Sequence, residues 1–236
     1  MPIRLDAVLV AGVALVCACS PDDTAPVSPV TQVGRLRFVH AVPDTAKAKT
    51  VNVRIDGMPL AANVAYKGVA GYVLAMAGDR QVAVRRTSDT SIVVLDQTVT
   101  VAAGGDYTVL ATGSGTGIAA LVLTDDNTTL SPGNARLRIV NASPVMGAAD
   151  VYVTAPGADL STATPVATSL AFRAATAYVA VTGGAPWQVR FTTPGDTTLL
   201  LAVPALTPAA GQVRTLLALD AATGGTPLTS ATLTDR

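Results

Sequence analysis

The sequence predicts an all-β fold of two tandem β-sandwiches, and three observations support this prediction. First, apolar and polar residues alternate over short stretches such as Val51–Ile55, which is the period of a half-buried strand. Second, turn residues such as Asp56-Gly57 and Gly104-Gly105 recur at intervals of roughly eight to twelve residues. Third, no stretch of about ten residues after position 19 has helical periodicity. This spacing is typical of a sandwich with about seven strands in each unit.

The chain carries the same pattern twice. Five segments of the first half reappear in the same order in the second half, at offsets between 98 and 110 residues: Arg35–Pro43 as Arg136–Pro144, Val53–Ile55 as Val151–Val153, Gly71–Val73 as Ala177–Val179, Gly104–Leu110 as Gly211–Leu217, and Leu121–Asp125 as Ala231–Asp235. Offsets that vary this little indicate two homologous domains with loop insertions. The last match also predicts that residues 228–235 form a terminal strand.

We therefore expect a first sandwich over residues 34–124, a linker over 125–134 and a second sandwich over 135–236. Each unit of about 90 to 100 residues has the size of an immunoglobulin-like domain, although the Cys…Trp…Cys hallmark is absent. In the first strand, Leu36 and Phe38 are expected to face away from Arg35 and Arg37.

The residues before the first sandwich predict export and a membrane anchor. The apolar run from Ala7 to Ala18 is about twelve residues long, whereas a membrane-spanning helix needs roughly 17 to 25. Its end, Val16-Cys-Ala-Cys19, resembles the lipobox of bacterial lipoproteins. That resemblance implies cleavage after residue 18 and a diacylglyceryl group on the Cys19 thiol, with palmitate among the acyl chains. Cys17 fits the lipobox less well, because the bulkier Val16 precedes it.

On this interpretation residues 1–18 are a lipoprotein signal peptide and residues 19–33 a Pro-rich tether. The fourteen residues from Ser20 to Val33 span about 40 Å when extended. The alternative, a short buried core helix, is disfavoured by the Ser-Pro-Asp-Asp sequence that follows the apolar run. Ser20 after the cysteine resembles outer-membrane sorting patterns, so we expect a lipid anchor in the outer membrane rather than the inner one.

Composition excludes several classes of protein. Lys plus Arg and Asp plus Glu number 16 each, so there is no electrostatic footprint for nucleic acid. With 50% hydrophobic and 14% charged residues, the chain lacks the signature of disorder. After processing Cys19 would be the only cysteine, so no intramolecular disulfide is possible, and nothing in the sequence calls for a cofactor.

His40, the only histidine, is predicted to hydrogen-bond the backbone at a strand end, as Asn141 does at the matching position. It lacks the further ligands that zinc needs, and no Gly-x-Ser-x-Gly elbow supports a catalytic triad. The glycines of Gly113–Gly117 resemble a phosphate-binding loop, but Ile118–Leu123 reads as a strand where that motif requires a helix.

The linker holds the best candidate metal ligands, Asp125, Asp126 and Asn127, whose oxygens suit calcium. Consecutive carboxylates point in different directions, however, and the alternating pattern of a calcium loop is missing. The competing interpretation is a solvated turn with side-chain capping, and it is the one favoured. We therefore assign no metal site.

Arginines recur on the first strand of each repeat. Arg35 with Arg37, and Arg136 with Arg138, are expected to project from one strand face, with Arg85 and Arg86 adding to that surface in the first half; such residues meet lipid headgroups or acidic polysaccharide. The favoured alternative is that they are positive charges on an edge strand, which block aggregation. Trp187 and the tyrosines are expected in the core.

The repeated motif also resembles a known family. Arg-Leu-Arg-Phe/Ile-Val-His/Asn-Ala-x-Pro, with Val53-Arg-Ile-Asp-Gly57, Gly71-Tyr72 and Ala103–Leu110, is similar to the bacterial envelope family called domain of unknown function 4397. The resemblance covers nearly the whole mature chain, twice. The second copy departs from it, with Thr154–Gly157 in place of Asp56-Gly57 and Arg214 in place of Tyr107. The family implies a secreted or lipid-anchored β-sandwich and no activity.

We therefore expect a non-catalytic, lipid-anchored envelope protein with a structural or adhesive role and an unidentified protein or polysaccharide partner. The alternative is an accessory module that binds a ligand such as polysaccharide, which an exposed strip of aromatic residues would favour. No pair of acid and base residues supports a hydrolase.

Overall fold

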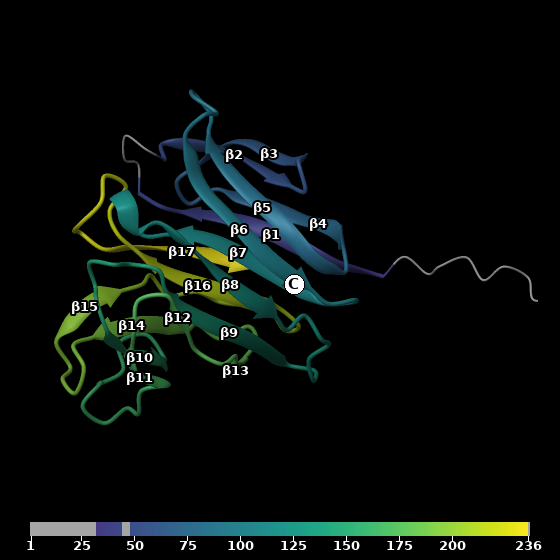
Figure 1. The fold of residues 1–236 in the computed structure, drawn as a ribbon. Helices are drawn as coiled ribbons and strands as arrows, with labels where there is room; N and C mark the ends of the chain where they lie inside the picture. Colours follow the sequence, from purple (N-terminus) through teal and green to yellow (C-terminus); the bar gives the residue numbers. More distant parts are fainter. Residues whose placement is uncertain (1–31, 44–47, 236) are drawn as a thin grey trace, which may run out of the picture. The chain divides into compact units, whose positions relative to one another are not determined.

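This computed structural model describes residues 32–43 and 48–235. Within these ranges all regular structure is β-strand, except one short 3₁₀ turn (Figure 1). The first half contains β1 (Val33–Ala41), β2 (Thr50–Ile55), β3 (Met58–Ala65), β4 (Val69–Met76), β5 (Gly78–Arg86), β6 (Val93–Val101), β7 (Asp106–Thr112), the 3₁₀ turn η1 (Gly115–Gly117) and β8 (Ala119–Asp125). The second half contains β9 (Asn134–Asn141), β10 (Ala149–Thr154), β11 (Ala167–Leu170), β12 (Ala174–Ala175), β13 (Val179–Thr182), β14 (Gln188–Thr192), β15 (Leu199–Ala202), β16 (Val213–Leu219) and β17 (Thr229–Thr234). The all-β prediction is confirmed.

Each half is built from two sheets with the same strand order. In the first half the sheets are β4-β1-β7-β8 and β3-β2-β5-β6. In the second half β12 and β13 both pair with β9 in the position of β4, giving β12-β9-β16-β17, and the other sheet is β11-β10-β14-β15. The first strand of each half pairs in parallel with the last strand but one, β1 with β7 and β9 with β16. We call the sheets that contain β1 and β9 the inner sheets.

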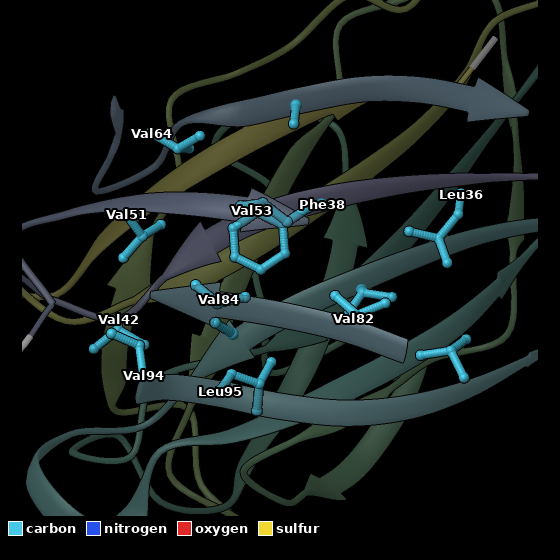
Figure 2. Close-up of a cluster of buried hydrophobic side chains, with 14 of the residues drawn as sticks. Leu36, Phe38, Val42, Val51, Val53, Val64, Val82, Val84, Val94 and Leu95 are labelled. Atoms are coloured by element: carbon cyan, nitrogen blue, oxygen red, sulfur yellow. The ribbon is translucent and has the colours of Figure 1, made fainter. Parts of the chain in front are cut away.

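Alternation along β1 explains how the first sandwich closes. Leu36 and Phe38 are fully buried against the other sheet of this half, the outer sheet, in one cluster with Val53, Val82 and Val84 from β2 and β5 (Figure 2). Arg35 and Arg37 project from the opposite face of the strand, as predicted. A corresponding cluster fills the second sandwich around Phe191.

Two short segments show local sequence directing the backbone. Asp56 and Gly57 have φ values of 49° and 77°, and they connect Ile55 to its strand partner Met58 in a two-residue hairpin. Turns with positive φ at both central residues match the twist of paired strands, so the predicted hairpin is confirmed. Gly34 on β1 is required for close packing: a Cβ there would lie 2.6 Å from Cγ1 of Val101.

The strand count differs from the prediction. The first half has eight strands and the second has nine, instead of about seven in each. Register shifts interrupt the pairing of β3 and β4, which weakens the alternation that marks a strand in sequence. The terminal strand, by contrast, is present as predicted, as β17.

Candidate functional site

The inner sheets of the two halves contact each other through a third apolar cluster, separate from the cores of the two sandwiches. Its buried members are Val39, Ala41, Leu110, Leu123, Val140, Ala142, Leu217, Leu219 and Leu233. Most members occur at matched positions of the repeat: Val39 corresponds to Val140, and Leu110 to Leu217. Because β1 and β9 each carry apolar residues on both faces, the inner sheets are buried on both sides.

Six polar side chains form a closed ring on these same facing surfaces. They are Arg37, Thr108 and Asp125 from the first half and Arg138, Thr215 and Asp235 from the second. The four charged side chains are at most 4% exposed. Charges this deeply buried are tolerated only when they are paired and hydrogen-bonded.

The ion pairs of the ring cross from one half to the other. Arg37 on β1 pairs with Asp235, which follows β17, and Nη2 of Arg138 on β9 lies 2.5 Å from Oδ1 of Asp125. Each guanidinium also donates to the carbonyl just before its partner carboxylate: Arg37 to Thr234 at 3.0 Å and Arg138 to Thr124 at 2.9 Å. Each arginine is thus bound twice to the last strand of the opposite half.

The two threonines complete the ring within each half. Nε of Arg37 donates to Oγ1 of Thr108 at 2.7 Å, and Thr108 donates to Oδ2 of Asp125 at 2.5 Å. In the second half Arg138 donates to Thr215 at 3.1 Å, and Thr215 donates to Asp235 at 2.6 Å. Each arginine therefore reaches the other half's carboxylate directly and its own half's through a hydroxyl, so the six groups polarise one another.

A tyrosine covers the ring from each half. The Tyr72 ring centroid lies 4.7 Å from Cζ of Arg37, and the Tyr178 centroid lies 4.7 Å from Cζ of Arg138. Their hydroxyls donate to Asp125 at 2.6 Å and to Asp235 at 3.2 Å. Burial raises the pKa of both hydroxyls. Each carboxylate thus accepts bonds from an arginine, a threonine and a tyrosine.

A second pair of matched contacts joins the halves. Lys67 and Arg173 have left-handed backbone conformations, with φ of 65° and 64°, and each reaches into the opposite half. Nζ of Lys67 donates to Oγ1 of Thr229 at 2.7 Å and to the Ser230 carbonyl at 3.2 Å. Nε of Arg173 donates to Oγ1 of Thr112 at 2.9 Å. The contact therefore has approximate twofold symmetry, like the self-complementary interface of a dimer.

Sequence reasoning did not identify the ring as a site, although the signal was present. Its six members all lie inside the five matched segments and are identical in the two halves, even where neighbouring apolar residues differ. The signal is a polar residue that is identical in both halves, at a strand position where an apolar residue is expected. The favoured interpretation of these arginines as edge-strand charges is wrong for Arg37 and Arg138, because β1 and β9 lie inside their sheets.

The outer arginines of the two strands pair at the surface. Arg35 contacts Asp106 at 2.5 Å, and Arg136 contacts Asp126 at the same distance. Burial alone would raise the pKa of Asp106, but hydrogen bonds from Arg35 and Asn127 outweigh it and hold that pKa below its ordinary value. Neither strand therefore presents a row of unneutralised charge.

The three calcium candidates bind three different partners. Asp125 belongs to the ring, Asp126 accepts from Arg136 and Thr128, and Nδ2 of Asn127 donates to Asp106 at 2.7 Å. All three line one shallow hollow, yet their oxygens do not converge there. In the described part of the chain, no three His, Cys, Asp or Glu side chains are grouped in a way that would hold a metal ion.

His40 is fully buried, and both of its ring nitrogens face backbone groups. Nε2 lies 2.7 Å from the Ala48 carbonyl, and the Val42 N–H lies 3.4 Å from Nδ1. Asn141 at the matching position donates to the Gly147 carbonyl at 2.6 Å. The predicted backbone hydrogen bonding is confirmed for both. Gly113–Gly117 is followed by β8 rather than a helix, as expected.

The aromatic residues do not form an exposed strip. All nine lie in the described part of the chain, and each is buried or half-buried. Trp187 packs against the core of the second sandwich, and its Nε1 donates to the Thr182 carbonyl at 3.0 Å. The feature that would have favoured a stacking platform for sugar rings is thus missing from residues 32–43 and 48–235.

The predicted signal peptide, the lipidation site Cys19 and nearly all of the tether lie outside the described residues. No helix within the described ranges is long and apolar enough to cross a bilayer.

Two surface hollows lie on the first half. One, of about 460 Å³, lies on the outer sheet between small residues of β3 and the polar side chains of Asn52, Arg54 and Arg85. The other, of about 400 Å³, runs between the free edges of β3 and β4 and is lined mainly by apolar residues, including Met58 and Leu74.

Comparison with known proteins gives one family and several solved structures. The family model described as "Domain of unknown function (DUF4397)" matches residues 34–152, just over half of the chain. The matched stretch runs from β1 into β10 and includes four ring members, Arg37, Thr108, Asp125 and Arg138. No curated protein matches the chain.

The first solved structure is CBMbc (family CBM26) from Eubacterium rectale Amy13K in complex with maltoheptaose, at 9% identity and a TM-score of 0.25, covering 84% of this chain and 96% of that one. The second is the Bacillus anthracis TIE protein, at 11% identity and a TM-score of 0.24, covering 86% of this chain and 44% of that one. At these TM-scores neither similarity bears on fold or function.

Proposed function

The chain belongs to the DUF4397 family, and on that premise we propose that it is a non-catalytic protein of the bacterial cell envelope, held on a membrane by acylated Cys19. Its role is structural or adhesive, and its partner is a protein or a polysaccharide. The observation that carries the proposal is the ring. The two buried ion pairs, Arg37 with Asp235 and Arg138 with Asp125, join the two halves and leave these charged groups inaccessible to a substrate.

The positions of the remaining titratable groups support a non-catalytic role. A general base must reach its substrate, and His40 is fully buried with both ring nitrogens at backbone groups. Asp125 and Asp235 are closed off by three donors each. A rigid surface for docking fits this arrangement better than a reactive cleft does.

We also infer that the two halves are two copies of one domain. Five matched sequence segments, the same strand order and matched contacts at the interface support this inference. The copies act as one body, because the ring and the third apolar cluster draw on both.

Cys19 gives the test of the anchor. We expect the full chain, expressed in a bacterium that processes lipoproteins, to incorporate labelled palmitate and to sediment with outer membranes. Cys19→Ala is expected to lose the label and become soluble, whereas the matched control Cys17→Ala keeps both properties. A wild-type chain without label would overturn the anchor, and loss of label in Cys17→Ala alone would move it to that residue.

Protease treatment of intact cells then separates the possible roles of the anchored protein. Loss of the mature protein without lysis places the sandwiches outside the cell, which supports an adhesive role. Protection until lysis supports a structural role inside the envelope.

One observation favours the alternative, a module that binds acidic polysaccharide. The hollow on the outer sheet brings Arg54 and Arg85 beside the small residues Ala61 and Ala62. Guanidinium groups recognise carboxylate and phosphate by paired hydrogen bonds, so a polymer carrying those groups would fit better than a neutral one. Arg54→Gln with Arg85→Gln should abolish retention on an acidic polysaccharide, while Arg214→Gln, on β16 of the second half and outside the hollow, should not. Equal retention of all variants would remove this candidate.

A further inference from the structure

The first half exposes four large apolar side chains along one side of its sandwich. Met58 is 71% exposed, Leu74 72%, Met76 58% and Val73 36%. They line the same open groove of about 400 Å³, between the start of β3 and the end of β4. Single exposed apolar residues are ordinary, but four gathered on one groove mark an interaction surface. We call these four residues the apolar edge.

The apolar edge lies where the chain enters the fold. Val33, the first residue of β1, pairs with Met76, and the Ala77 N–H donates to the Gln32 carbonyl at 2.8 Å. In Figure 1 the start of β1 and the end of β4 lie together, at the point where the described chain begins. Thirteen residues separate Cys19 from Val33, and they span at most about 45 Å. Whatever holds Cys19 therefore stays within reach of the apolar edge.

The second half serves as an internal comparison. Pairing registers equate Leu74 with Ala180 and Met76 with Thr182, since Thr182 pairs with Asn134 as Met76 does with Val33. The two copies thus keep the same residues in the ring and differ at this edge. At the positions of Leu74 and Met76 a large apolar side chain is present only in the half that follows the tether, so packing within the sandwich does not require it.

Charge at the groove does not oppose contact with an apolar surface. The acidic residue that lines it, Asp56, is paired with Arg80 at 2.9 Å. Arg54, at the same hairpin, donates to the Gly57 carbonyl. Apolar side chains rimmed by arginine are typical of protein surfaces that insert shallowly into lipid headgroups.

From these observations we propose that the apolar edge is a lipid-contacting surface, which seats the first sandwich on the bilayer that holds Cys19. This inference rests on the proposed anchor. It assigns an orientation to the anchored protein: the β3–β4 side of the first half meets lipid, and the loop between β5 and β6, at the far end of β5, points away.

The test uses the acylated full chain reconstituted into vesicles of phosphatidylethanolamine and phosphatidylglycerol. After acylation the mature chain has no free thiol, so Met58→Cys introduces a single site for an environment-sensitive fluorophore. We expect spin-labelled lipid to quench the probe at Met58→Cys at least threefold more than a probe at Thr90→Cys, in the β5–β6 loop.

Two further variants distinguish lipid contact at the apolar edge from non-specific adsorption of exposed apolar side chains to the vesicles. In the Met58→Cys background, Leu74→Ala with Met76→Thr copies the second half and should bring quenching down to the level at Thr90→Cys. The matched control, Ala180→Leu with Thr182→Met, adds the same side chains to the other half and should leave quenching unchanged. Equal, weak quenching at Met58→Cys and Thr90→Cys on vesicle-bound protein would overturn the inference while leaving the anchor intact.

Two other outcomes are distinct. If the wild-type chain carries no lipid, the proposed anchor itself fails, as the palmitate experiment would show independently. If Leu74→Ala with Met76→Thr converts a detergent-solubilised dimer to a monomer without changing quenching, the apolar edge binds a second copy of the chain and the lipid assignment is wrong.

Discussion

Arg37 shows how a residue can be misjudged from sequence and why. Its place in an alternating strand was predictable, and so was the face it occupies. The burial of that face was not, because it depends on a second sheet some hundred residues later in the chain. Local patterns report which residues share a face, but they do not report what covers it.

The buried ion pairs give the first prediction. Arg37→Met leaves Asp235 as a buried charge without its partner, so we expect a loss of about 3–5 kcal/mol in the free energy of unfolding. The double variant Arg37→Met with Asp235→Leu should recover most of that loss, because no lone charge remains. Urea unfolding of both proteins measures the difference.

Arg80→Met is the control for that experiment. Its pair with Asp56 is 23% and 41% exposed, so its removal should cost only about 0–1 kcal/mol. If Arg37→Met costs no more than Arg80→Met, the ring does not stabilise the contact between the halves.

The tyrosines give a second prediction, in alkaline solution. Burial raises the pKa of Tyr66, Tyr72 and Tyr178, so the unfolded chain ionises before the folded one as the pH rises above about 10. The contribution of these three tyrosines to the free energy of unfolding is fully present below that pH and is lost as the pH rises above it. The lowered pKa of Lys67 acts in the opposite sense, but that residue is one group against three.

Urea midpoints measured across this alkaline range check the sign. In Tyr72→Phe with Tyr178→Phe, the decline with pH should be shallower, although the protein is less stable at neutral pH. An unchanged slope would mean that these hydroxyls ionise as freely in the folded chain as in the unfolded one.

At the level of the strands, sequence predicted well wherever a turn or an alternation was strong. The Asp56-Gly57 hairpin, β8 after the Gly113–Gly117 loop and the terminal β17 all lie where they were expected. The bounds of β3 and β4 could not be predicted, because register shifts disturb their alternation. The parallel pairing of β1 with β7 was also out of reach, since pairing between distant strands leaves no local trace.

Gly34 supplies a prediction at this scale. A Cβ at that position would lie 2.7 Å from the carbonyl oxygens of Ala102 and Gly105, which are backbone atoms and cannot rotate away. We expect Gly34→Ala to push β1 from the β6–β7 turn and to cost about 1–3 kcal/mol. Gly71→Ala is the matched control, because a Cβ there meets nothing within 4 Å. Equal thermal melts of the two variants would contradict the close approach.

For the molecule as a whole, the contact between the halves predicts a single cooperative unfolding transition. An isolated half would expose the residues of the third apolar cluster together with unpaired arginine and aspartate. Such a fragment is expected to aggregate or to pair with itself through the same surface, as obligate dimers do.

Cutting the chain between the halves tests this directly. A protease site inserted between Thr129 and Leu130, in the loop between β8 and β9, should be cleaved without separating the halves in gel filtration. The same cut in Arg37→Met should release them at low concentration. Separation of the cut wild-type chain would show that the connecting loop, and not the ring, holds the halves together.

The crossing of the two ion pairs also has a consequence for descent. Arg37 binds Asp235, 198 positions away. A substitution at Arg37 is therefore expected to be compensated by a substitution at Asp235, and not at the equivalent Arg138. Across the family, covariation should therefore link the start of one copy to the end of the other. Recombination that exchanges a single copy between diverged relatives would then join mismatched surfaces, so the two copies are expected to be inherited as a pair.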